Sequence, residues 1–120
     1  MENEESSIVE VEFSGEFERK LRPLFKRYRQ ILNDIQPIIK QLQAGEQPGD
    51  LLAELTVTVF KVRARNSDAQ RGKSGGYRLI YQVVSSAKIV LLTIYSKSDQ
   101  DAIAAAEIEE IVAALKRRGE

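Results

Sequence analysis

The chain has 120 residues, of which 42% are hydrophobic and 30% are charged, a composition typical of one folded globular domain. It contains no cysteine and no histidine, which excludes disulfides, thiolate metal sites and the commonest general base at neutral pH. Lysine and arginine balance aspartate and glutamate at 18 each, and a net charge of zero by itself disfavours a nucleic-acid partner.

The charges are separated along the chain. Acidic residues gather in residues 1–18 and 99–110, and both stretches lack basic residues. Residues 61–78 carry one acid, Asp68, against six basic residues: Lys61, Arg63, Arg65, Arg71, Lys73 and Arg78. Such asymmetry predicts one basic face on a neutral protein.

We expect a single domain over residues 1–120, with residues 1–6 as a flexible tail. The chain start is acidic and lacks the apolar stretch of a signal peptide, and no apolar run approaches the roughly 18 residues of a membrane span. These features predict a cytoplasmic protein without a membrane partner.

The first half of the sequence predicts a strand followed by two helices. Near-alternation of apolar residues indicates a strand over residues 7–13, and Ser14 is a candidate helix N-cap. Apolar residues at helical spacing then run from Phe17 to Leu42 and predict two helices. The sequence does not fix where the first helix ends and the second begins. Pro23 lies inside the first segment, and Pro37 is expected in the first turn of the second or at a bend.

The second half predicts three strands, over residues 56–65, 76–84 and 89–95, and a helix from Asp99 onward. The order is therefore β-α-α-β-β-β-α. Three consecutive strands indicate an antiparallel meander, with the first strand joining at an edge or beside a later strand. We expect an α+β fold with the helices packed on one face of a small sheet.

The strand at residues 56–65 is the first candidate for chemistry. Phe60, Val62 and Ala64 share one parity and should face a helix. The three basic residues of the opposite parity should project from the other face, at about 6–7 Å spacing: Lys61, Arg63 and Arg65. Such a row can bind phosphates and offset charge in a phosphoryl transition state, although a solvated edge strand has the same pattern.

Tyrosines and glycines supply further candidates. Tyr77, Tyr81 and Tyr95 can stack on RNA bases or transfer protons, but strand tyrosines are commonly packing residues. Arg78 has the opposite parity to Tyr77 and Tyr81. The glycine-rich segment 72–76 is not a nucleotide-triphosphate loop, because the required upstream glycine is absent and a strand follows.

Lys97 closes the last predicted strand and can reach the basic face. Asp99 and Asp101 follow it, and we interpret them as first-turn helix residues favoured by the helix dipole rather than as metal ligands. No metal and no small-molecule cofactor is predicted.

Three segments together resemble the RelE/ParE superfamily of toxins from type II toxin–antitoxin systems. They are FKVRAR at 60–65, GGYRLIYQV at 75–83 and LLTIYSKS at 91–98, and the likeness covers residues 8–115. The resemblance implies a RelE-like fold. It also implies a ribosome-dependent endoribonuclease that promotes attack of an mRNA 2′-hydroxyl on the adjacent phosphate without a metal. The implied partners are a cognate antitoxin, the ribosome and mRNA.

The resemblance implies roles for Lys61, Arg63, Arg65, Arg78 and Lys97, and the side-chain chemistry described above adds Tyr81, Tyr95, Arg71 and Lys73. The expected catalytic residues are Lys61, Arg63, Arg78, Tyr81 and Lys97. The expected RNA- or phosphate-binding residues are Arg65, Arg71, Lys73 and Tyr95.

Some features depart from the family pattern. Ser98 stands where some relatives carry a catalytic arginine, and the last helix has no aromatic residue. Two alternatives therefore stay open: a ParE-like, non-enzymatic inhibitor of DNA gyrase, and a decayed toxin that only binds its antitoxin.

Overall fold

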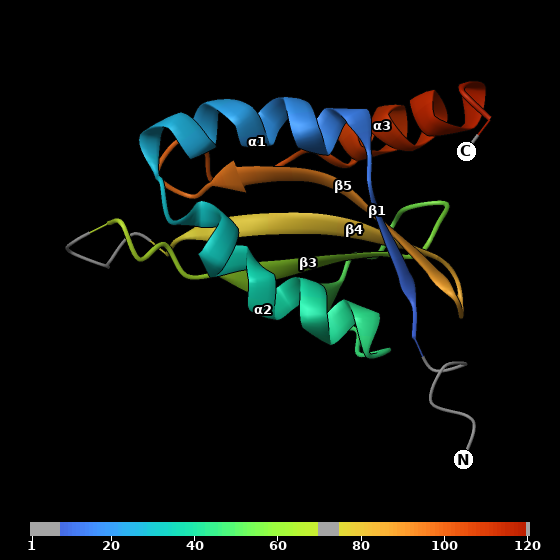
Figure 1. The fold of residues 1–120 in the computed structure, drawn as a ribbon. Helices are drawn as coiled ribbons and strands as arrows, with labels where there is room; N and C mark the ends of the chain where they lie inside the picture. Colours follow the sequence, from blue (N-terminus) through green and yellow to red (C-terminus); the bar gives the residue numbers. More distant parts are fainter. Residues whose placement is uncertain (1–7, 70–74, 120) are drawn as a thin grey trace, which may run out of the picture.

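A computed structural model describes residues 8–69 and 75–119 (Figure 1). The elements follow in the order β1 (Glu10–Phe13), α1 (Gly15–Arg27), α2 (Ile31–Gln43), β2 (Asp50–Leu51), β3 (Val59–Ala64), β4 (Tyr77–Ser85), β5 (Lys88–Ser96) and α3 (Ala105–Arg117). The predicted α+β class is confirmed. The two-residue strand β2 is an addition to the predicted order.

The five strands form one sheet in the order β1-β5-β4-β3-β2. Strand β1 is parallel to β5, and the other neighbours are antiparallel. The meander is therefore confirmed, and β1 joins it both at an edge and beside a later strand, as predicted. In the described residues, no helix has the length and apolar character needed to cross a membrane.

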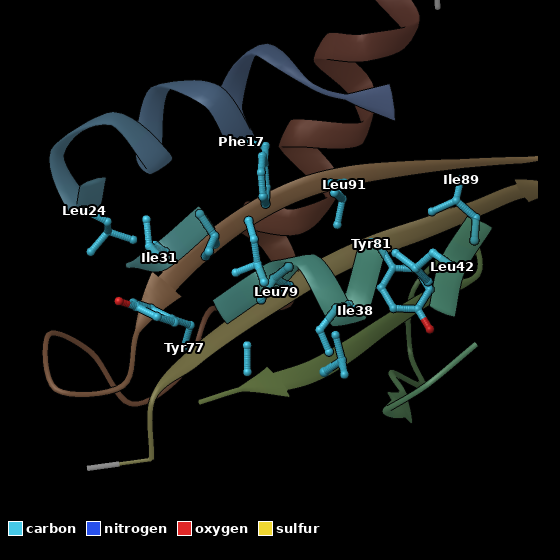
Figure 2. Packing of buried hydrophobic residues seen from close by; sticks show 14 of the residues in the cluster. Phe17, Leu24, Ile31, Ile38, Leu42, Tyr77, Leu79, Tyr81, Ile89 and Leu91 are labelled. Carbon is cyan, nitrogen blue, oxygen red and sulfur yellow. The ribbon is translucent and has the colours of Figure 1, made fainter. Parts of the chain in front are cut away.

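The sheet is covered on both faces, so the prediction that all helices pack on one face is wrong. Helices α1 and α2 cover one face and build the larger core, seen in Figure 2. Helix α3 packs on the other face, against residues that include Ile80, Val90 and Leu92. The physical reason lies in β5, where Ile89 and Leu91 face one side while Val90 and Leu92 face the other. A strand that is apolar on both sides needs cover on both sides.

Helix α1 begins where Ser14 accepts a hydrogen bond from the Phe17 backbone N–H at 3.0 Å, as expected of an N-cap. The Ser14 hydroxyl also donates to the Leu92 carbonyl at 2.9 Å, which ties the start of α1 to β5. Pro23 lies inside α1. Pro37 is the seventh residue of α2, so its predicted place in the first turn is wrong.

Helix α3 begins at Ala105, six residues after the predicted start at Asp99. A tertiary ion pair replaces the predicted helix turn: Arg27 Nη1 lies 2.8 Å from Asp99 Oδ2. Asp99 and Asp101 are therefore not first-turn helix residues.

Candidate functional site

Strands β3 and β4 and the segment after β5 bring predicted basic residues together on the face of the sheet that α3 partly covers. Arg63 on β3 is the register partner of Arg78 on β4, and Arg78 is in turn the partner of Tyr95 on β5. Lys61 is the partner of Ile80. Directly opposed residues share a face and neighbouring strands lie about 4.8 Å apart, so these cations form one cluster.

The cluster lines a cleft of about 510 Å³, which we call the basic cleft. Its lining residues come from β2, β3, β4 and the segment after β5: Gly49, Asp50, Lys61, Val62, Arg63, Arg78, Lys97 and Asp101. Among the described residues, four cationic side chains line the cleft with two carboxylates, which leaves an excess of two positive charges. A larger groove of about 650 Å³ lies between α1 and α3, but the described residues that line it include as many acidic as basic side chains. The basic cleft therefore carries the clearer chemical signal.

Arg78 is the most constrained cation of the basic cleft. Only 8% of its surface is exposed, and its Nη1 donates to the Gly75 and Tyr77 carbonyls. Gly75 has φ +87°, and a Cβ there would lie 3.5 Å from both Arg78 Nη2 and Lys97 Cγ. These are ordinary contact distances, so it is the left-handed φ that favours glycine at this position. Two backbone carbonyls hold the guanidinium.

Lys97 is fixed by its backbone, whereas its ammonium group is only loosely paired. Its N–H donates to the Gly76 carbonyl at 2.8 Å, which joins the end of β5 to the start of β4. Lys97 Nζ lies 3.9 Å from Asp101 Oδ1, and the Asp101 side chain is 95% exposed. Such an exposed pair contributes little, so the ammonium remains available to an anion.

Ser98, at the position of the expected arginine, does not line the basic cleft. Its hydroxyl lies 2.9 Å from the hydroxyl of the buried Ser96. This serine therefore adds no cation to the cluster.

The structure places Tyr81 on the opposite face of the sheet. Figure 2 shows its ring in the core near Leu42 and Ile89, and its surface is 0% exposed. The hydroxyl donates to the Pro48 carbonyl at 2.6 Å, and the ring stacks on Phe60 at 5.4 Å between centroids. Burial raises the pKa of Tyr81 well above the ordinary range of tyrosine. Tyr81 is not brought to the basic cleft, and this geometry contradicts its predicted catalytic role.

Tyr95 lies on the same face as Arg78, but its ring is only 6% exposed. Its hydroxyl is buried and has no hydrogen-bond partner among the described residues, and burial raises its pKa. A ring enclosed in this way offers no surface on which a base can stack. The predicted RNA contact of Tyr95 therefore does not fit this conformation.

The remaining predicted residues lie away from the basic cleft or outside the described structure. Arg65 is exposed just beyond the end of β3 and does not line the cleft. Arg71 and Lys73 lie outside the described residues. Within the described residues, no group of three or more histidine, cysteine, aspartate or glutamate side chains could hold a metal ion.

Sequence reasoning missed the two carboxylates of the basic cleft. Asp101 was interpreted as a first-turn helix residue. Asp50 stands in a turn-like stretch of sequence that gives no indication of a catalytic role. Asp50 reaches the cleft because β2 pairs with β3, where it is the register partner of Lys61. No local pattern in the sequence predicts this long-range pairing.

Two helices before an antiparallel run of strands, a parallel first strand and a closing helix define a RelE-like fold. Among solved structures, the chain is similar to the E. coli toxin RelE, in a mutant with two arginines replaced by alanine, in the free state. The TM-score is 0.50 at 18% sequence identity, over 94% of this chain and 99% of that one. No family model matches the sequence, and no curated protein sequence matches it. The likeness is one of fold, and it confirms the fold implied by the resemblance.

Proposed function

We propose that this chain is a toxin of a type II toxin–antitoxin system that cuts translated mRNA on the ribosome. One observation carries the proposal: Lys61 and Arg63 from β3, Arg78 from β4 and Lys97 from the segment after β5 converge on the basic cleft. Four neighbouring cations repel one another, so folding gains little from this arrangement. An RNA phosphate would supply the missing negative charge.

In the proposed reaction, the 2′-oxygen of a nucleotide attacks the adjacent phosphorus, and the bond to the 5′-oxygen of the next nucleotide breaks. Negative charge grows on the phosphoryl oxygens in the transition state. Preorganised cations stabilise such charge because they need no rearrangement at the moment of reaction. Arg78 fits this role best, since two carbonyls already hold its guanidinium.

The proposed partners follow from this activity. The ribosome would present the mRNA, and a cognate antitoxin would restrain the toxin in the cytoplasm. An acidic antitoxin segment would complement the excess positive charge of the basic cleft.

Primer extension on a translated mRNA, with purified ribosomes and protein, tests the proposal. Wild-type protein should produce ribosome-dependent cuts. Arg78→Ala should slow cleavage by about 10²–10³-fold, the usual effect of removing one preorganised charge-stabilising donor. The matched control is Arg22→Ala, which removes an exposed arginine of α1 on the other side of the sheet.

Two results would overturn the proposal. One is the absence of cuts from folded wild-type protein, and the other is unchanged cleavage by Arg78→Ala. Fold alone does not fix the target. A gyrase supercoiling assay would then separate a ParE-like inhibitor from a protein that only binds its antitoxin.

A further inference from the structure

The proposed cleavage needs a group that takes the proton from the attacking 2′-hydroxyl. The chain has no histidine, arginine does not act as a base, and lysine side chains are ordinarily protonated at neutral pH. Tyr81 is in the core. Among the described residues that line the basic cleft, the two carboxylates are Asp50 and Asp101. An aspartate side chain is ordinarily ionised and able to accept a proton.

Backbone pairing positions Asp50, whose side chain is exposed on the two-residue edge strand β2. It belongs to β2, where register pairing with Lys61 puts both side chains on the same face. The preceding Gly49 has φ +99°, and a Cβ there would lie 2.3 Å from the Lys61 carbonyl oxygen. Only glycine allows the chain to approach β3 so closely. The close approach therefore delivers Asp50 to the edge of the cation cluster.

Asp101 is placed less favourably. It lies in the irregular segment between β5 and α3, its side chain is 95% exposed, and its carboxylate already faces the Lys97 ammonium at 3.9 Å. Asp50 and Lys97 lie at opposite ends of the cleft, on β2 and after β5. The row of Lys61, Arg63 and Arg78 lies between them. Displacement at phosphorus requires the attacking and leaving oxygens to lie roughly in line, on opposite sides of the phosphorus.

We propose that Asp50 is the general base of the cleavage reaction, an inference that rests on the proposed function. The Asp50 carboxylate takes the proton from the 2′-hydroxyl as the 2′-oxygen forms its bond to phosphorus. The bond from phosphorus to the 5′-oxygen breaks, and the Lys97 ammonium gives that oxygen a proton. The products are a 2′,3′-cyclic phosphate and a 5′-hydroxyl. Asp50 then releases its proton to solvent, and Lys97 takes a proton from solvent.

Chemical rescue tests the role of Asp50 in single-turnover cleavage of ribosome-bound mRNA. Asp50→Ala should slow the reaction by about 10²–10⁴-fold, the usual contribution of a general base. Sodium formate should then raise the rate in proportion to its concentration, whereas sodium chloride at equal ionic strength should not. Asp50→Asn keeps the side-chain volume, so it should be equally slow and show no rescue. A purely structural role for Asp50 would not respond to formate.

Asp101→Ala is the charge-matched control, because it removes the other carboxylate of the basic cleft. The inference is wrong if Asp50→Asn, folded by circular dichroism, cleaves within about threefold of wild type, far from the loss expected of a missing base. It is also wrong if formate rescues Asp101→Ala instead of Asp50→Ala. A wild-type protein that makes no cuts would refute the proposed function itself. Measuring the wild type first therefore separates failure of the proposed function from failure of the Asp50 inference.

Discussion

At the scale of single residues, Arg78 is the side chain whose placement most needs a ligand to explain it. It is nearly buried, and among the described residues no carboxylate lies within 4 Å of its guanidinium. A buried charge without a counter-charge lowers stability, and two carbonyl contacts offset that cost only in part. A bound phosphate would complete the site. This reasoning makes Arg78 the first residue to replace.

Tyr81 makes the opposite case, since its position is explained by packing. We predict that Tyr81→Phe lowers the free energy of unfolding by about 1 kcal/mol, because the Pro48 carbonyl loses its hydrogen-bond donor. The ring and its stacking on Phe60 are kept. Urea denaturation measures the stability, and ribosome-dependent cleavage should match wild type. A cleavage defect much larger than the stability loss would return Tyr81 to the catalytic candidates.

The raised pKa of Tyr81 gives this prediction a pH dependence. Burial makes the folded state hold the phenolic proton more tightly than the unfolded chain does. The stability from the neutral phenol is therefore complete below about pH 10, the unfolded pKa, and is lost as the pH rises beyond it. Wild type should lose more stability than Tyr81→Phe across this range. Equal losses in the two proteins would contradict the assigned burial effect.

The alternation of side chains along a strand predicts which face of the sheet a residue occupies. It does not predict how deeply that residue is buried or what it contacts. Alternation along β3 correctly separates Lys61 and Arg63 from Phe60 and Val62. The odd spacing between Arg78 and Tyr81 already places them on opposite faces. The catalytic role expected of Tyr81 rested on the chemistry of its phenol, although the alternation disfavoured it. The burial of Arg78 was not predictable, because it depends on how the chain at Gly75 folds back.

At the scale of elements, the sequence fails where tertiary contacts override local pattern. Strand β2 has two residues, too few for any periodicity, and exists because it pairs with β3. The segment after β5 carries acids typical of a helix start, yet Asp99 pairs with Arg27 and α3 begins later. The long strands were predicted well, because each is long enough for its apolar residues to show a local periodicity.

Gly49 offers a test of how β2 shapes the basic cleft. We predict that Gly49→Ala destabilises the protein by more than the roughly 1–2 kcal/mol of a left-handed alanine, because the new Cβ would also clash with the Lys61 carbonyl. Moving β2 away from β3 should also displace Asp50 and slow cleavage. Thermal unfolding and single-turnover cleavage measure the two effects.

Gly45→Ala is the matched control for this change. Gly45 also has a left-handed φ, +93°, but a Cβ there would meet nothing within 4 Å. Its cost should be conformational strain alone, with no effect on the basic cleft. Equal losses of stability and activity in the two variants would show that the close contact between Gly49 and β3 does not determine the position of β2.

At the scale of the whole molecule, one sheet separates two cores of different size. The α1 and α2 side encloses large buried side chains such as Phe17, Tyr77 and Leu79. The α3 side is smaller, and α3 adds a polar anchor where Glu109 accepts from the Thr56 N–H and hydroxyl, both at 2.9 Å. Strand β5 is apolar on both of its faces. It therefore required cover on both faces, an implication that the predicted one-sided packing overlooked.

This inequality predicts that α3 detaches before the rest of the molecule unfolds. Local opening of α3 exposes only the smaller core, so its amides should exchange with a lower opening free energy than those of Leu79 and Leu91. Native-state hydrogen exchange at low denaturant measures both. Ile108→Ala should widen the gap, because it removes about 2–5 kcal/mol of packing from α3 while leaving the α1 and α2 side intact. If α3 exchanges only by global unfolding, both cores form one cooperative unit, and the basic cleft shares the stability of the whole sheet.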